Sequence, residues 1–214
     1  MQERKQQFMR GAIWDAAVDL FAGKGFDETT VEEIAQAAGV SRRSFFRYFS
    51  SKNDLMGQAI VTFGTAVSDA IAACPGVCTP LEVLRHTVLH IATGAAANPR
   101  TRRIIAVTKG SAAARQAQIS RMAEAEDRVA QAYAARFQSG SAADLTPRLL
   151  TGLTLSIIDV TIRVWFDRGR QDISISAGQV FDALTHVVCD GSAQRRKAKR
   201  SARRSPLSRV KRRN

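Results

Sequence analysis

The sequence predicts an all-α protein, in which a small three-helix N-terminal domain is followed by a larger helical domain. Apolar residues recur three and four positions apart along most of the chain, the spacing that lays an apolar stripe along one face of a helix. The first such stripe, which ends before Gly23 and Gly25, consists of Ile13, Ala16, Ala17, Leu20 and Phe21. No segment keeps the strict alternation of apolar and polar residues that is typical of a half-buried strand.

Capping motifs place two short helices next to each other after that stripe. The run Thr30-Val-Glu-Glu33 is a capping box, in which the threonine hydroxyl accepts from a first-turn N–H and Glu33 accepts from the threonine N–H. Gly39 supplies the left-handed residue that ends this helix. Ser41 then caps a third helix, which ends near Phe49. Two helices joined by a short turn with a glycine have the geometry of a helix-turn-helix.

Further caps and loops divide the rest of the chain. Ser51-Lys-Asn-Asp54 opens a helix that runs to about Ala72, and two prolines and a glycine mark a linker that ends at Pro80. Later helices are expected at about 80–95, 100–108, 112–138, 145–168 and 175–189, with a loop over 139–144. We therefore expect a helix-turn-helix domain over residues 1–50, a helical domain over 51–190 and a disordered basic tail over 191–214.

The basic charge of the chain is concentrated in that tail. The net charge is +13, but eleven of the 32 Lys and Arg residues lie after Gln194, where there is no acid. The first 194 residues therefore carry a net charge of only +2. The tail is either a flexible solubilising segment or, as we favour, an arm that adds sequence-independent affinity for DNA by neutralising phosphates.

The third helix has one apolar face and one basic face. We expect the core positions to be Val31, Ile34, Ala35, Val40, Phe45 and Phe49. The opposite face, from which we expect contacts to double-stranded DNA, carries Arg42, Arg43, Ser44, Phe46, Arg47 and Tyr48. Arginines in the first turn of a recognition helix can match guanine O6 and N7. Phosphate contacts are expected from Thr29, Thr30, Tyr48 and Lys52. Three arginines alone could form a solvated surface, but the caps and the glycine turn favour DNA binding.

The run from Thr29 to Lys52, TTVEEIAQAAGVSRRSFFRYFSSK, is similar to the motif of the TetR family of bacterial regulators, and the match covers about residues 8–56. The resemblance implies an all-α homodimer with a three-helix DNA-binding domain, a fourth helix as connector and a larger ligand-binding domain. It also implies that the last two helices of each subunit form a four-helix bundle. Two features depart from the family pattern: Phe46 stands where many members have tyrosine, and the long basic tail is not a family feature.

A homodimer is also indicated by the segment from Leu149 to Phe166. Its helix is apolar on nearly every side and must be covered on all sides, by the core and by a second subunit or by the core alone. Asp159 and Arg163, one turn apart, interrupt it, and its length is short for a bilayer, so we expect no membrane contact. Expected dimer contacts are Leu150, Leu153, Ile157, Ile158, Thr161, Val164, Val180 and Leu184. A two-fold dimer predicts an inverted-repeat, palindromic operator.

A small-molecule effector site is weakly specified by the sequence. Candidate pocket walls, each of which is also an ordinary core position, are His90, Ile91, Ile105, Thr108, Ile119, Met122 and Trp165. Such walls favour a hydrophobic effector, to which Arg102 and Arg103 would add an anion contact; an acyl thioester would fit this combination, and so would many other lipophilic compounds. His86 and His90 have metal-ligand spacing but no evident third ligand, so no metal and no cofactor are expected.

These features favour a ligand-responsive repressor in the cytoplasm, associated with the nucleoid and released from its operator by a small hydrophobic effector. The alternative is a sequence-tolerant architectural DNA-binding protein that uses its basic tail. An enzyme is not expected, because no Gly-rich phosphate loop, nucleophile elbow, catalytic residue or metal cluster is evident. The three cysteines, Cys74, Cys78 and Cys189, do not form a disulfide framework and are interpreted as incidental.

Overall fold

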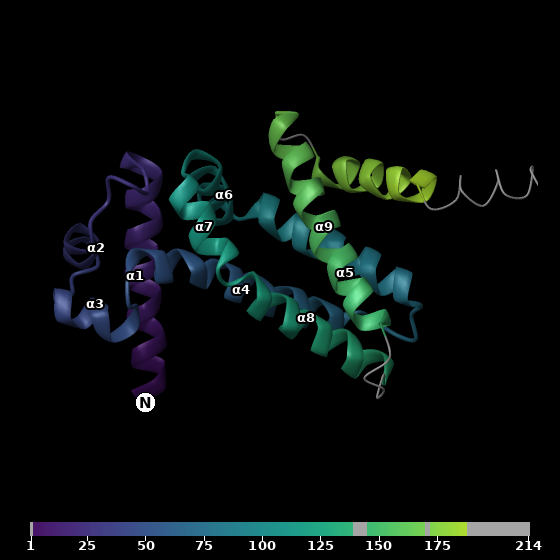
Figure 1. The fold of residues 1–214 in the computed structure, drawn as a ribbon, viewed down its shortest axis with the longest axis horizontal. Coiled ribbons are helices and arrows are strands. Elements are labelled where there is room, and N and C mark those ends of the chain that lie inside the picture. The colour runs from purple at the N-terminus through teal and green to yellow at the C-terminus, as the bar shows by residue number, and fades with distance from the viewer. Residues whose placement is uncertain (1, 139–144, 170–171, 188–214) are drawn as a thin grey trace, which may run out of the picture.

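The computed structural model describes residues 2–138, 145–169 and 172–187, and all regular structure in these ranges is helical (Figure 1). The helices are α1 (Gln2–Lys24), α2 (Val31–Ala37), α3 (Arg42–Tyr48), α4 (Lys52–Ala73), α5 (Pro80–Ala97), α6 (Pro99–Gly110), α7 (Ala112–Ile119), α8 (Met122–Phe137) and α9 (Thr146–Asp167). Residues 173–187 are also helical. The all-α prediction is thus confirmed. The expected 139–144 loop and the basic tail lie outside the described residues.

The prediction of a single helix over 112–138 was wrong, because the structure has two helices there, α7 and α8. Ser120 donates its hydroxyl hydrogen to the carbonyl of Ala117 at 2.7 Å, a local bond that competes with helix propagation. Arg121 then leaves the helical region of the backbone, with φ −110° and ψ 4°. The side chain of Arg121 forms ion pairs with Asp54, at 2.6 Å, and Glu124, at 3.0 Å.

We call α1–α3 the head and the remaining helices the body. In Figure 1 the head occupies one end of the molecule, and α4 runs from it into the body beside α8. The core of the head contains Ile13, Phe21, Ile34 and Phe45, all at most 2% exposed. The same core includes Leu55 and Met56 of α4, Val107 of α6, and Ala114 and Ala117 of α7. One apolar cluster therefore crosses the boundary that we expected at residue 50.

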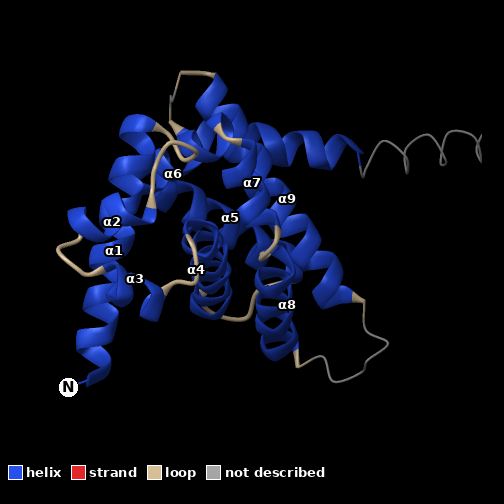
Figure 2. Ribbon diagram, turned by 60° about the vertical axis from the view of Figure 1, so that its left-hand side comes forward, coloured by secondary structure: helices blue, strands red, loops and turns tan. Residues whose placement is uncertain are grey.

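The body is organised around α4, α5, α8 and α9, which pack against one another (Figure 2). Helices α4 and α8 approach closely at Gly64, where a Cβ would lie 2.9 Å from the Cα of Ala125. Between α8 and α9, the buried hydroxyl of Tyr133 is hydrogen-bonded to that of Thr154 at 2.7 Å. Burial raises the pKa of this phenol, so the pair is a neutral hydrogen bond inside the core.

Candidate DNA-binding surface and effector hollow

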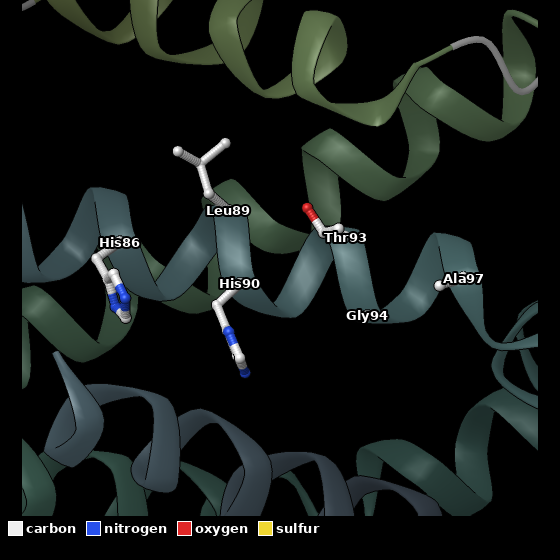
Figure 3. Close-up of a pocket in the computed structure, with 6 residues that line it drawn as sticks. All are labelled: His86, Leu89, His90, Thr93, Gly94 and Ala97. Atoms are coloured by element: carbon white, nitrogen blue, oxygen red, sulfur yellow. The ribbon is translucent and has the colours of Figure 1, made fainter.

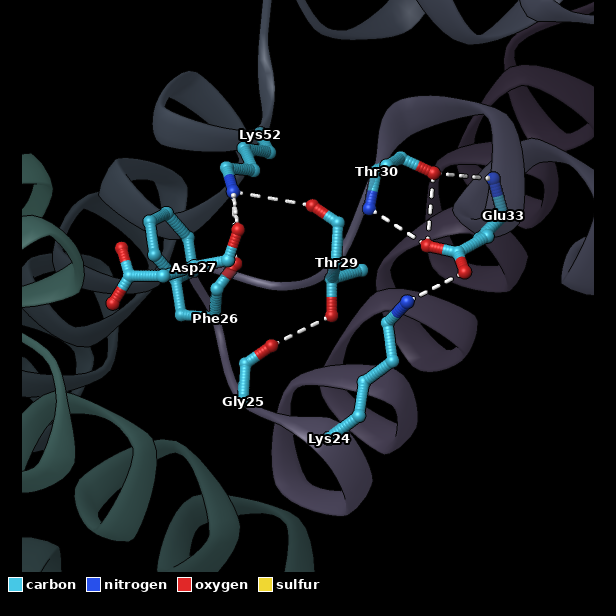
Figure 4. A network of polar contacts seen from close by, with 8 residues as sticks. All are labelled: Lys24, Gly25, Phe26, Asp27, Thr29, Thr30, Glu33 and Lys52. Atoms are coloured by element: carbon cyan, nitrogen blue, oxygen red, sulfur yellow. Dashed lines mark hydrogen bonds and ion pairs between the residues drawn. The ribbon is translucent and has the colours of Figure 1, made fainter.

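The local structure of the helix-turn-helix follows from its capping residues, as expected. Thr30 and Glu33 form a reciprocal capping box at the start of α2 (Figure 4). Lys24 of α1 is 2.5 Å from the Glu33 carboxylate, and this contact and the Thr30 hydrogen bonds lower the pKa of Glu33 to about 2. Glu33 therefore stays ionised at neutral pH and ties the end of α1 to the start of α2.

The turn and the apolar anchors then orient α3. Gly39 has φ +66°, a left-handed conformation that a side chain would strain. The Ser41 hydroxyl accepts from the N–H of Ser44 and caps α3. Phe45 is fully buried and Phe49 is 3% exposed, with their ring centroids 5.9 Å apart. These contacts fix which face of α3 points outward.

The outward face of α3 is basic and exposed. Arg42, Arg43, Phe46 and Arg47 are all exposed on it. Arg42 is held by Glu32 at 2.9 Å and lies over the Phe46 ring, while Arg47 lies over the ring of Tyr48 and donates to its hydroxyl at 3.3 Å. Within the described residues, Arg43 makes no hydrogen bond or ion pair. Its guanidinium is therefore free to bind an external acceptor.

Two residues expected to contact phosphates, Thr29 and Lys52, make hydrogen bonds to the backbone of the protein itself (Figure 4). Thr29 is 1% exposed, and its hydroxyl donates to the carbonyl of Gly25 at 2.7 Å. Lys52 points inward and donates to the carbonyls of Phe26, Asp27 and Thr29 at 2.9, 2.9 and 3.1 Å. All three donors of an ammonium group are used in this way. We therefore assign both residues a structural role in holding the loop before α2.

Four polar contacts, here called the aspartate contacts, join α6–α8 to the head and to the first turn of α4. Arg100 and Arg103 of α6 form ion pairs with Asp15, at 2.9 Å, and Asp19 of α1. The Ser111 hydroxyl donates to Asp27 at 2.9 Å, and Arg121 pairs with Asp54 at 2.6 Å. Partial burial alone would raise the pKa of Asp54. Hydrogen bonds from Ser50 and Arg121 outweigh this effect, so the pKa lies below its usual value. Arg103, expected at a pocket mouth, is thus engaged with the head.

An open hollow of about 490 Å³ runs along one side of α5 (Figure 3). It is lined by His86, Leu89, His90, Thr93, Gly94 and Ala97, so His90 is the one member of the expected pocket that lies in it. The other expected wall residues lie elsewhere: Ile119 is 53% exposed, Trp165 is 3% exposed against Ala92 and Ile173, and Thr108 bonds its own helix. Ile91 packs against the body core, and Ile105 and Met122 are half-buried.

The His86 and His90 imidazoles point to the same side of α5, and their rings lie 6.1 Å apart and nearly parallel (Figure 3). The Nδ1 atom of His86 is buried without a hydrogen-bond partner. Among the described residues there is no group of three or more His, Cys, Asp or Glu that would hold a metal. The residues that line the hollow recur at helical spacing along 86–97, so the sequence itself shows that they share one face of α5.

Helix α9 has an apolar outer face. Leu145, Leu149, Leu153 and Val160 are between 41% and 64% exposed, and Gly152 and Ser156 lie exposed between them. Of the residues expected to form a dimer, Leu153 is on this face, whereas Leu150, Ile157, Ile158 and Thr161 are at most 8% exposed inside the protomer. Val164, Val180 and Leu184 are half-buried. Asp159 and Arg163 pair within the helix at 2.8 Å.

Two helical stretches, Arg42–Ala73 and Thr146–Asp167, are long and apolar enough to cross a membrane when judged by length and composition alone. Both contribute α-helices to the body: α4 packs against α5, α7 and α8, and α9 packs against α5 and α8. Part of their apolar surface is therefore used in packing within the protein, and 39% of each apolar window is buried.

The Lys52 geometry predicts that Lys52→Met, which keeps the stem but removes the three donors, lowers the free energy of unfolding by about 1–3 kcal/mol. Urea denaturation measures this loss. Lys109→Met, which breaks a surface ion pair with Asp167, is the control and should cost at most about 1 kcal/mol. The salt dependence of DNA binding should not change for Lys52→Met. A stable variant whose salt slope falls by about one would instead make Lys52 a phosphate contact.

Comparisons with known proteins agree with this architecture. Residues 13–59 match the family model of bacterial regulatory proteins of the tetR family. The HTH-type transcriptional regulator TcmR of Streptomyces glaucescens is 27% identical over 86% of both chains, and AcrR of Shigella flexneri is 30% identical over about half of each. The solved structure of NalD from Pseudomonas aeruginosa has a TM-score of 0.60 at 22% identity, covering 84% of this chain and 96% of that one. The head therefore carries the DNA-binding domain of the tetR family of bacterial regulatory proteins, and the chain as a whole is similar to transcriptional regulators of that family.

Proposed function

We propose that the protein is a ligand-responsive repressor that binds an inverted-repeat operator as a homodimer and is released by a small hydrophobic effector. The main support for this proposal is the outward face of α3, which carries exposed arginines. The opposite face of the same helix is buried in the core of the head. Repression is supported by relatives of the fold: NalD is described as the secondary repressor of a multidrug efflux pump. The site of action would be chromosomal DNA in the cytoplasm.

Base reading is assigned chiefly to Arg43. It is exposed in the first turn of α3 and is not engaged by any described residue, so its forked donors are available for a guanine edge. Arg42 is held by Glu32, and binding DNA through it would require that pair to open. Thr30, Arg47 and Tyr48 are placed for phosphates, which fix the register of the head without reading sequence. Ser44 lies with Arg43, Phe46 and Arg47 around a shallow hollow on this face.

The homodimer is assigned to the apolar outer face of α9. Large exposed apolar patches on a protein mark contact surfaces. Gly152 has open space around the position of a Cβ, so a second helix can approach the backbone closely there. In the helix 173–187, Ile175 and Val187 are likewise exposed. Two protomers joined here would carry two heads, and a two-fold pair of heads requires a two-fold operator.

The effector is assigned to the α5 hollow. Its volume of about 490 Å³ lies within the range of ligand pockets, roughly 300–1,000 Å³. Largely apolar walls that include two imidazoles suit a hydrophobic molecule that also carries a polar group. FadR of Bacillus subtilis, which shares the fold with a TM-score of 0.55 at 21% identity, is described in complex with stearoyl-CoA. That likeness supports a fatty or other lipophilic effector for this chain.

Release of DNA would follow from the position of the hollow. Ala97 lines its end, and α6 begins two residues later at Pro99. Helix α6 carries Arg100 and Arg103, which hold α1 through the aspartate contacts. A ligand that binds more tightly when α6 is displaced would therefore shift the head away from its DNA-bound position, since only differential affinity can move such an equilibrium.

Replacement of Arg43 with Ala should weaken operator binding by about 1–3 kcal/mol and change binding to random DNA little, because a base contact is lost. Arg128→Ala is the matched control, since Arg128 is an exposed arginine on α8, away from this face. Titration of both variants on operator and on random duplex at one salt concentration gives the comparison. Equal losses on both DNAs would make Arg43 a phosphate contact and remove the main support for sequence reading.

Replacement of Leu153 with Glu should convert the dimer into a monomer, because it buries a charge in the α9 interface. Sedimentation velocity at micromolar concentration measures this change. Ile119→Glu places the same charge on another exposed apolar side chain, on α7, and should leave the dimer intact. A Leu153→Glu variant that sediments as the wild type does would exclude this face as the interface.

A further inference from the structure

Two thiols meet at the junction of α4 and α5. Cys74 caps the end of α4, and Cys78 directly precedes Thr79, which caps α5. The three residues between them are Pro75, Gly76 and Val77. Gly76 has φ +72°, so the Pro-Gly pair reverses the chain. The two Sγ atoms lie 3.6 Å apart, in contact but not bonded.

The loop that carries the thiols is held by contacts outside itself. Arg136 of α8 donates to the carbonyls of Cys74 at 2.7 Å, Gly76 at 3.1 Å and Ala72 at 3.3 Å. The Cys78 thiol is 3.0 Å from the carbonyl oxygen of Pro75, to which it donates. The two sulfur atoms are therefore held close together by a fixed turn. Little conformational entropy has to be lost for them to meet.

The two thiols differ in their access to solutes. Cys74 is 5% exposed and belongs to the core cluster of the body, whereas Cys78 is half-exposed. Burial raises the pKa of the Cys74 thiol, and the neighbouring Cys78 adds to that rise. Cys74 is thus kept protonated and shielded, while Cys78 is the thiol that a small molecule in solution meets first.

We propose that Cys74 and Cys78 form a modification site at which a peroxide makes a reversible disulfide within one protomer. The Cys78 sulfur attacks hydrogen peroxide, the O–O bond breaks, and Cys78 sulfenic acid and water are formed. The Cys74 sulfur then displaces the hydroxyl group from that sulfenic acid, and the Cys74 proton leaves with it as a second water. One peroxide is reduced and two thiols are oxidised. The Sγ atoms have to move about 1.5 Å closer to reach the S–S bond length of about 2.05 Å.

The bridge would close a five-residue loop between α4, the helix that leads to the head, and α5, the helix that lines the hollow. Closing so short a loop shifts the folding equilibrium toward the folded protein by roughly 30-fold in the chain-entropy relation. This inference is independent of the proposed repressor function, because it requires only the two helices and their junction.

The test uses the full chain with Cys189→Ser, which leaves the pair as the only thiols. Hydrogen peroxide is added stepwise, free thiols are alkylated, and intact mass and peptide maps are recorded. We expect a loss of two hydrogen atoms per protomer, a linkage of Cys74 to Cys78 that does not depend on protein concentration, and full recovery with dithiothreitol. The unsubstituted chain, whose folding no mutation has altered, should show the same linkage.

The control variant is Cys78→Ser in the same background, which should retain one alkylatable thiol at Cys74. In Cys74→Ser, sulfenic acid on Cys78 should persist and be trapped by dimedone. Two free thiols after peroxide treatment would overturn the proposal. So would a linkage that forms between protomers or through Cys189, or oxidation of Cys78 to sulfinic acid without a bridge.

Discussion

Ala114 and Ala117 of α7 complete the core of the head, and this apolar contact fixes where the head lies on the body. The four aspartate contacts surround it, but exposed ion pairs contribute only about 0–1 kcal/mol each. Burial of apolar residues from α4, α6 and α7 in the core of the head therefore contributes to the attachment together with the aspartate contacts. Because Leu55 and Met56 of α4 belong to the same core, the head cannot turn without moving α4 or α7.

This attachment connects the α5 hollow to α3 through a chain of packed helices. The hollow ends where α6 begins, α6 pairs with α1, and α1 packs against α2, which packs against α3. Along α4, Gly57 and Gly64 leave no room for side chains between this helix and α7–α8. Closely packed helices shift as units and do not deform locally. The proposed effector therefore acts through displacement of whole helices, and the aspartate contacts are what such a displacement would change.

Much of the fold was predictable because its signals are local. The Thr30 capping box, the left-handed Gly39 and the buried Phe45 each depend on a few neighbouring residues, and the structure has all three. The internal hydrogen bonds of Lys52 and Thr29 could not be predicted from the sequence, for the opposite reason. The carbonyls that bind Lys52 come from residues at least 23 positions earlier in the chain, and a single helix pattern does not show them.

The effector hollow and the outer face of α9 show the same limit. Helix α9 is apolar on most sides, so the sequence predicts that it is covered but not which side meets a second subunit. The structure buries Leu150 and Ile158 and leaves Leu149 and Leu153 outside, because α5 and α8 pack on the other side. Similarly, Trp165 is a residue type that often lines pockets, but here it packs with Ala92 and Ile173 in a small core. Such distinctions depend on how helices pack, which periodicity within one helix does not determine.

We propose that α3 reads a particular DNA sequence as part of a two-fold dimer. DNase I footprinting of the full chain on the DNA upstream of its own gene tests it most directly, at a salt concentration near physiological. We expect a bounded footprint over an inverted repeat whose half-sites are centred roughly 34–36 Å apart along the duplex, or a multiple of this distance. Uniform protection along the fragment, equal on unrelated DNA, would contradict it and would identify a sequence-tolerant DNA-coating protein.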